Sequence, residues 1–181
     1  MEFYELAMMR ESTRKYTGEK IPREKLIECV EAARIAPSAC NSQPWKFIIV
    51  DDEKLVEQFP GWLQREDSPI NHFTRNCKNF VVVVEEKANL RDEVAQRFGS
   101  HQAFAEIDLG LAVENFCLQA TALGIGTCIM GWLEQGEMKE ALKIPEEATV
   151  RLVIAAGVSA TERPRTKARK DLEEIMGINK Y

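Results

Sequence analysis

Residues 79–84, Asn79-Phe80-Val81-Val82-Val83-Val84, decide the fold, because four consecutive valines favour a β-strand. A run that stays apolar without alternation is typical of a strand buried on both faces. We therefore predict that this strand lies at the centre of a sheet. Elsewhere in the chain, apolar runs at 45–50, 127–131 and 149–156 predict three further strands, of which the strand at 45–50 is expected to be mostly buried.

Segments of helical periodicity alternate with these strands. Pro22 suits the start of a helix and Pro37 follows its end, so the residues between them predict a helix that leads into the first strand. The other predicted helices cover 2–9, 53–63, 104–123 and 135–142. The helix at 104–123 is rich in apolar positions and is expected to pack in the core or at a subunit interface. Residues 64–78 lack clear periodicity and are predicted to form a long loop or lid.

Composition limits the class of protein. The 181 residues, 45% of them apolar, provide one domain, 1–181, with a full core. A net charge of -5 argues against general binding of nucleic acid or an anionic membrane. No apolar run approaches the roughly 20 residues that a spanning helix needs. The five cysteines are odd in number and contain no CxxC pair, which favours reduced thiols and a cytoplasmic location.

Basic residues near both ends of the chain have the pattern of an anion receptor. Arg10, Ser12 and Arg14 alternate, and in an extended backbone alternate side chains project to the same side. Guanidinium groups on either side of a hydroxyl suit a phosphate or a carboxylate. Exposed charge alternation is the other interpretation. The alternating Lys167 and Arg169 belong either to a solvated tail or to the same anion site.

Two further segments are suited to holding a ligand. The stretch Arg34-Ile35-Ala36-Pro37-Ser38-Ala39-Cys40-Asn41-Ser42-Gln43-Pro44-Trp45 presents small polar side chains and backbone N–H groups between two prolines, so it can wrap a polar ligand. A polar connection held by its own side chains is the alternative. The glycines that flank residues 127–130 let a backbone or a flat ligand approach closely, unless they only mark a helix-to-strand junction.

Several kinds of chemistry find little support. With only His72 and His101, the chain has few residues for a metal site or a Ser/His/Asp triad, and no metal site is expected. It contains no GxGxxG after a strand and no GxxxxGK[ST]. Cys40 or Cys128 could act as a nucleophile if its pKa were lowered, although a small buried thiol is the commoner case.

A series of motifs occurs in order along the chain. They are Arg10-x-Ser12-x-Arg14-x-Tyr16, Pro37-Ser38-Ala39-x-Asn41-Ser42-Gln43-Pro44-Trp45, Asp108-Leu109-Gly110-Leu111-Ala112, Leu123-Gly124-Ile125-Gly126-Thr127-Cys128 with Gly131, and Lys167-x-Arg169 before Leu172-Glu173-Glu174-Ile175. Together they resemble the FMN-dependent nitroreductase family across nearly the whole chain. The segment from Pro37 to Trp45 is the most specific part of the resemblance.

The resemblance implies an α+β fold with three α–β–α layers around a central mixed, mostly antiparallel sheet. It also implies a homodimer, formed through the long helix, with FMN in pockets at the interface. Of the residues implied to hold FMN, Arg10, Ser12 and Arg14 contact its phosphate, ribityl chain and pyrimidine edge, and Lys167 and Arg169 contact the phosphate. The partner chain is implied to contribute Pro37, Ser38 and Asn41, with Gln43 nearby. The backbone of Cys128, Ile129, Met130 and Gly131 is implied to lie against the ring.

The function that the resemblance implies is hydride transfer from NADH or NADPH to FMN, and then to a small acceptor such as a nitroaromatic or a quinone. The flavin carries this chemistry, so no catalytic side chain is expected. The alternatives are a flavin enzyme of the same fold that removes halogens, reduces unsaturated bonds or breaks down flavin, a non-catalytic FMN-binding protein, and a cysteine acyltransferase. The chain departs from the family in being short. Segments that cover the ring are expected to be reduced to 64–78 and 87–102, and a C-terminal arm to be short or absent.

Overall fold

The computed structural model describes residues 2–65, 67–162 and 164–181 and contains a four-stranded sheet in the order β1-β2-β4-β3. The strands are β1 (Trp45–Val50), β2 (Asn79–Glu85), β3 (Gly126–Met130) and β4 (Thr149–Gly157). Each neighbouring pair is antiparallel. In the described residues, the parallel part of the expected mixed sheet is an isolated bridge between Ser12 and Thr127. The predicted α+β class is confirmed.

The position of β2 confirms the prediction made from its valines. Every residue of β2 is buried, and the strand lies between β1 and β4. The prediction that β1 is mostly buried was wrong, because only Val50 of that strand is fully buried. The reason is that β1 is an edge strand, which pairs with β2 alone.

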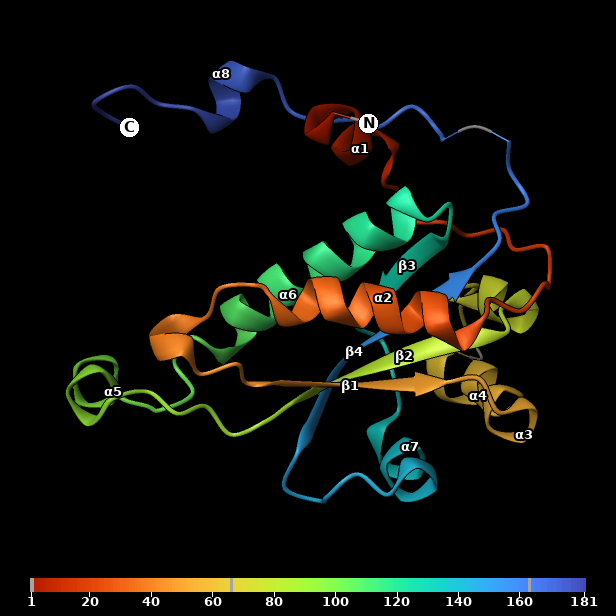
Figure 1. The fold of residues 1–181 in the computed structure, drawn as a ribbon, viewed down its shortest axis with the longest axis horizontal. Coiled ribbons are helices and arrows are strands. Elements are labelled where there is room, and N and C mark those ends of the chain that lie inside the picture. Colours follow the sequence, from red (N-terminus) through yellow and green to blue (C-terminus); the bar gives the residue numbers. More distant parts are fainter. Residues whose placement is uncertain (1, 66, 163) are drawn as a thin grey trace.

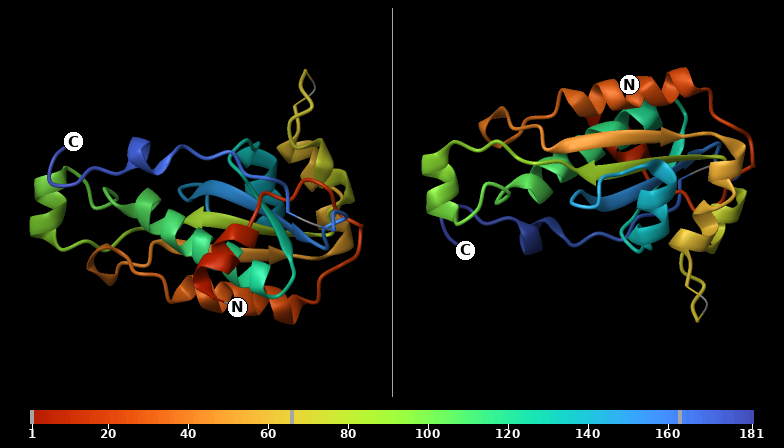
Figure 2. Two further views of the ribbon diagram at one scale, coloured as in Figure 1. Left: turned by 90° about the horizontal axis from the view of Figure 1, so that it is seen from above. Right: turned by 90° about the horizontal axis from the view of Figure 1, so that it is seen from below.

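Helices cover both faces of this sheet and form the three expected layers (Figures 1 and 2). On one face lie α2 (Arg23–Arg34) and α6 (Ala105–Ala122), and on the other lie α3 (Glu53–Val56), α4 (Phe59–Leu63) and α7 (Gln135–Leu142). Side chains of β2 alternate between the two layers. Val81 and Val83 belong to the core beneath α2 and α6, whereas Val82 and Val84 belong to the core beneath α4 and α7.

Two helical segments differ from the prediction. The single helix expected at 53–63 is divided into α3 and α4, because Pro60 lacks an N–H group and fits only the first turn of a new helix. Residues 87–102 contain α5 (Asp92–Phe98), and residues 64–78 contain the 3₁₀ helix η2 (His72–Asn76). The remaining short helices are α1 (Phe3–Met9), η1 (Ala39–Asn41) and α8 (Leu172–Ile175). Within the described ranges, no helix has both the length and the apolar character that crossing a membrane requires.

The segment after α1 is held along the ends of β3 and β4. The N–H group of Thr13 donates to the carbonyl of Thr127 at 2.8 Å, and Tyr16 forms an antiparallel bridge with Ser159. Gly126 makes this packing possible, because a Cβ atom there would lie 2.6 Å from Oγ1 of Thr13. The sheet therefore fixes where Ser12 and Arg14 stand.

Candidate functional site

A cavity of about 530 Å³ opens between the end of β3 and the segment before η2, which is the size range of small-molecule sites. Its walls are Arg14, Ser68, Pro69, Ile70, Asn71, Phe73, Ile129, Met130, Gly131 and Trp132. The cavity thus brings together four of the predicted site residues, from the N-terminal segment and from β3. The aromatic rings of Phe73 and Trp132 were not predicted, because neither lies in a motif.

A second cavity, of about 270 Å³, adjoins the first at Arg14. Glu11, Ser12, Arg14, Lys15, Thr161 and Arg165 line it. Ser12 and Arg14 therefore line one cavity, whereas Arg10, which was expected on the same side, is not among its lining residues. Glu11 and Lys15 line the same cavity, so the segment does not divide its side chains as strictly as an ideal strand would.

Cations from the two ends of the chain converge beside these cavities. The pKa of Lys167 is lowered, first by burial and then by the positive charge of Arg10, with Arg169 and Arg165 acting in the same direction. The ammonium group of Lys167 also donates to the carbonyl of Met8, at the end of α1. Lys167 therefore stands close enough to both Arg10 and Arg169 to feel their charges.

Carboxylates balance this positive charge only in part. Glu114 of α6 lies 3.6 Å from Nε of Arg10. Glu11 accepts a hydrogen bond from the main-chain N–H of Arg165 at 3.0 Å, and its carboxylate lies 3.8 Å from Nε of the same residue. Arg165 was not among the predicted residues, although it alternates with Lys167 and Arg169 in the sequence.

The wall at the end of β3 includes Gly131, which has no side chain. A Cβ atom at Gly131 would meet only Leu152, at 3.8 Å, so a flat group can approach the backbone closely at this point. Cys128 lies behind this wall and is buried. Burial raises the pKa of its thiol, while Arg14 and Arg165 act in the opposite direction. These properties are those of a packed thiol and do not favour a nucleophile.

The other predicted site residues lie elsewhere in the chain. Residues 37–44 form a loop, hereafter the interface loop after the role that the resemblance implies. Its Ala39 contacts Asp108 in the first turn of α6, whereas Thr13, next to Arg14, bonds to Thr127, beyond the last turn of the same helix (Figure 1). An α-helix rises 1.5 Å per residue, so the 18 residues of α6 span roughly 27 Å. One copy of the chain therefore does not bring this loop to the two cavities. Pro37, Asn41 and Gln43 are exposed and Ser38 is partly exposed.

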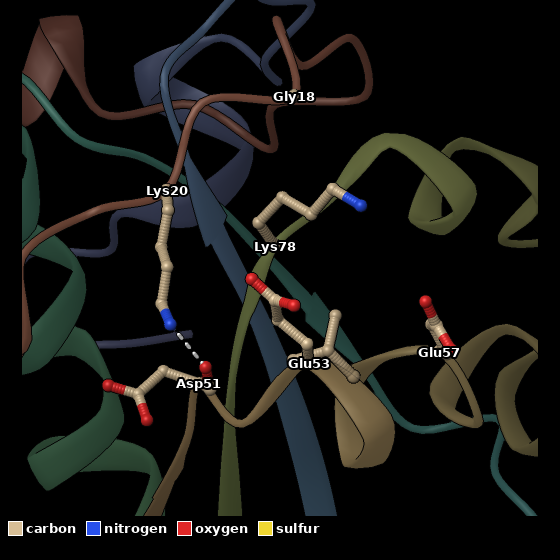
Figure 3. Close-up of a pocket in the computed structure, with 7 residues that line it drawn as sticks. Gly18, Lys20, Asp51, Glu53, Glu57 and Lys78 are labelled. Carbon is tan, nitrogen blue, oxygen red and sulfur yellow. Dashed lines mark hydrogen bonds between the residues drawn. The ribbon is translucent and has the colours of Figure 1, made fainter.

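A further cavity, of about 330 Å³, lies at the start of α3 and contains none of the predicted residues (Figure 3). Lys20 and Lys78 face the acidic residues Asp51, Glu53 and Glu57 across it. The ammonium of Lys20 already donates to the main-chain oxygen of Asp51, at 2.5 Å. The carboxylate of Asp51 also accepts hydrogen bonds from Arg23. Because this cavity contains none of the predicted residues, we place the candidate site at the two cavities that meet at Arg14.

Comparison with known proteins gives a consistent result. A model of the nitroreductase family matches residues 7–158. The solved structure of an FMN-dependent nitroreductase from Clostridium difficile R20291 is 26% identical, covers 97% of this chain and 98% of its own, and has a TM-score of 0.72. An NADPH-dependent oxidoreductase of Staphylococcus aureus is 26% identical over 98% of this chain and 73% of its own. The iodotyrosine deiodinase of Thermotoga neapolitana is 44% identical over 64 residues, 35% of this chain and 34% of its own.

Proposed function

Because this chain belongs to the nitroreductase family, we propose that it is an FMN-dependent oxidoreductase that oxidises NADH or NADPH and passes the electrons to a small acceptor. Nitroaromatics and quinones are the acceptor class that we propose. Relatives named as an FMN-dependent nitroreductase and an NADPH-dependent oxidoreductase support the assignment of cofactor and reductant.

The observation that carries this proposal is the convergence of Arg10, Arg165, Lys167 and Arg169. Positive groups that lower the pKa of a neighbouring lysine repel it, and a bound anion relieves that repulsion. A phosphate monoester, with a charge of about -2, is suited to such a cluster because hydrogen bonds between charged groups contribute roughly 1.5 to 3 kcal/mol each. We therefore assign the phosphate of FMN to this cluster.

The larger cavity fits the ring of the same ligand. We assign the backbone of Cys128, Ile129, Met130 and Gly131 to one face of the ring and Arg14 to its pyrimidine edge. When bound, FMN supplies the hydride chemistry between nicotinamide and acceptor. Arg14 contributes positive charge beside the ring, which favours an anionic reduced form. Phe73 and Trp132 offer apolar surface on which a planar acceptor can stack while water is excluded.

We propose that the site is completed by a second copy of the chain. No residue of the interface loop lines the two cavities of its own chain, and the loop contacts the first turn of α6, which supports the assignment of Pro37, Ser38, Asn41 and Gln43 to the site of the partner. α6 offers a surface for such a dimer, because Ile107 and Leu111 are 62% and 44% exposed and lie one helical turn apart. All five cysteines are free thiols, which supports a cytoplasmic location.

Anaerobic reduction tests this function directly. The purified protein, saturated with FMN and freed of excess, is titrated with NADH and with NADPH while flavin absorbance is recorded. We expect at least one of them to bleach the flavin, and a nitroaromatic or quinone to restore it. A flavin that neither nucleotide bleaches would make the chain an FMN-binding protein without this activity.

A second candidate reaction is reductive dehalogenation. The relative named iodotyrosine deiodinase favours it, through its 44% identity over 64 residues. An acceptor panel that contains a nitroaromatic, a quinone and an iodophenol distinguishes the two reactions. Release of iodide at a rate above that of nitroaromatic or quinone reduction would favour dehalogenation.

A further inference from the structure

We propose that Asp108 is a positioning residue for the flavin site of the partner subunit, because it holds the interface loop in the conformation that enters that site. This inference rests on the proposed function, since it requires an FMN site that two copies share. It assigns a role to a buried carboxylate that has no place in the cavities of its own chain.

The surroundings of Asp108 are unusual for a charged group. The residue lies in the first turn of α6 and is only 4% exposed. Both of its carboxylate oxygens lie 3.1 Å from the main-chain nitrogen of Ala39, which donates to them. In the described part of the chain, no Lys, Arg or His forms an ion pair with it. A buried carboxylate is costly unless it is hydrogen-bonded, so the N–H group of the loop is a main source of its stabilisation.

The interface loop needs such support because its backbone is strained. Cys40, Asn41 and Gln43 have φ values of 53°, 54° and 49°. This left-handed region is uncommon for residues other than glycine and persists only where the surrounding structure enforces it. Among the described residues, hydrogen bonds tie the loop to the rest of the chain at three points: from the N–H of Ala39 to Asp108, from the N–H of Asn89 to Oγ of Ser42 at 2.6 Å, and from the N–H of Glu86 to the carbonyl of Pro44 at 3.1 Å. The bond to Asp108 is the one nearest Ser38.

The position of this contact predicts an effect across the subunit interface. Loss of the Asp108 carboxylate removes the contact of the loop at Ala39, which is next to Ser38 and two residues before Asn41. The contacts of Arg14, Gly131 and Lys167 in the same chain involve neither Asp108 nor the interface loop, so these residues keep them. The damaged site is therefore the one that receives the loop, in the partner.

The first test measures FMN affinity in homodimers. We expect Asp108→Ala to weaken FMN binding by roughly tenfold to a hundredfold, the effect of one charge-assisted hydrogen bond, while the native mass stays that of a dimer. Asp108→Asn keeps an acceptor oxygen and should recover part of the affinity. Glu106→Ala is the matched control, because it removes a 72% exposed carboxylate from the same turn and should leave FMN binding unchanged.

The second test uses heterodimers, purified through two different tags, of an Arg14→Ala copy and an Asp108→Ala copy. One site of this heterodimer receives both changes and the other receives neither. We therefore expect one FMN per heterodimer to bind with wild-type affinity, a result that a general loss of stability would not produce. If Asp108→Ala does not fold, Asp108→Asn takes its place.

Unchanged FMN affinity in both Asp108 variants would overturn the positioning role. Two weakened sites in the heterodimer would also overturn it, because the loop would then act in its own chain. A different outcome would contradict the proposed function itself: a wild-type protein that does not bind FMN.

Discussion

At the scale of single residues, the site depends on glycines that leave room for a neighbour. Thr13 is buried and packs over Gly126, while the adjacent Ser12 and Arg14 line the cavities. A side chain at Gly126 would therefore move the segment that carries both site residues. This coupling gives a test that leaves every proposed ligand-binding side chain in place.

We predict that Gly126→Ala destabilises the protein by about 1 to 3 kcal/mol, the usual cost of overpacking, and also weakens FMN binding. The new Cβ atom would lie 2.6 Å from Oγ1 and 2.9 Å from Cγ2 of Thr13. Urea denaturation and FMN titration measure the two effects. Gly136→Ala is the control, because nothing lies within 4 Å of its Cβ position in α7 and alanine favours a helix. Equal effects of the two substitutions would refute the explanation.

Arg14 joins the two cavities, and its removal should be felt mainly in binding. We predict that Arg14→Ala weakens FMN binding by roughly tenfold to a hundredfold through loss of one charge-assisted contact. Equilibrium dialysis of the flavin measures this change. The thermal midpoint should remain close to that of the wild type, because no ion pair of Arg14 is recorded among the described residues. Retention of flavin at wild-type affinity would remove Arg14 from the site.

Which residues could be predicted from sequence follows from the kind of signal that each carries. Arg10, Ser12, Arg14, Lys167 and Arg169 stand out because charged residues alternate. Thr13 has no such signal, since its importance comes from a neighbour that lacks a side chain. The left-handed backbone of Cys40 and Gln43 was equally unreadable, because it depends on tertiary contacts such as the one to Asp108.

At the scale of elements, the C-terminal segment contributes the part of the cation cluster that responds to pH. The lowered pKa of Lys167 arises from burial and from the neighbouring arginines. A bound phosphate favours the charged ammonium and therefore raises the pKa of Lys167. At pH values between the pKa of Lys167 in the free protein and its pKa in the FMN complex, FMN binding is accompanied by proton uptake.

We therefore predict that FMN affinity falls as the pH rises through the lowered pKa of Lys167, where the free amine loses its proton. Titrations of FMN at increasing alkaline pH measure this slope. Lys167→Met should bind FMN more weakly and lose this part of the pH dependence. Lys170→Met, in the same basic run, should keep it. A Lys167→Met protein with the wild-type slope would contradict the assignment.

Elements with a strong internal pattern were predicted well, and those set by context were not. The valines of β2 and the apolar positions of α6 are local sequence patterns, so each element could be predicted without knowing which elements pack against it. By contrast, α3 and α4 each span about one turn, which gives too few residues for a periodic signal. β1 has the composition of a buried strand but lies at the edge, because strand order depends on the whole sheet.

For the molecule as a whole, exposed apolar residues offer a surface for the proposed dimer. Phe3, Tyr4 and Met8 of α1 are exposed, as are Ile107 and Leu111 of α6. α1 packs against α6, so these side chains lie on neighbouring elements. Contiguous exposed apolar patches on a protein commonly mark a site of interaction with another molecule.

We predict that Leu111→Asp disrupts the dimer and thereby abolishes FMN binding, because it places a charge in the proposed interface. Sedimentation velocity and flavin content, measured on the same sample, report both effects. Gln58→Asp adds a charge to an exposed position on the opposite helical layer and should change neither. A monomeric Leu111→Asp protein that retains FMN would show that one copy suffices.

The central claim is that two copies of the chain build each flavin site. Native mass and bound flavin, measured together on the wild-type protein after saturation with FMN and removal of the excess, test it most directly. We expect a dimer that carries one FMN per chain. A monomer that retains stoichiometric FMN, or a dimer that remains colourless, would contradict it.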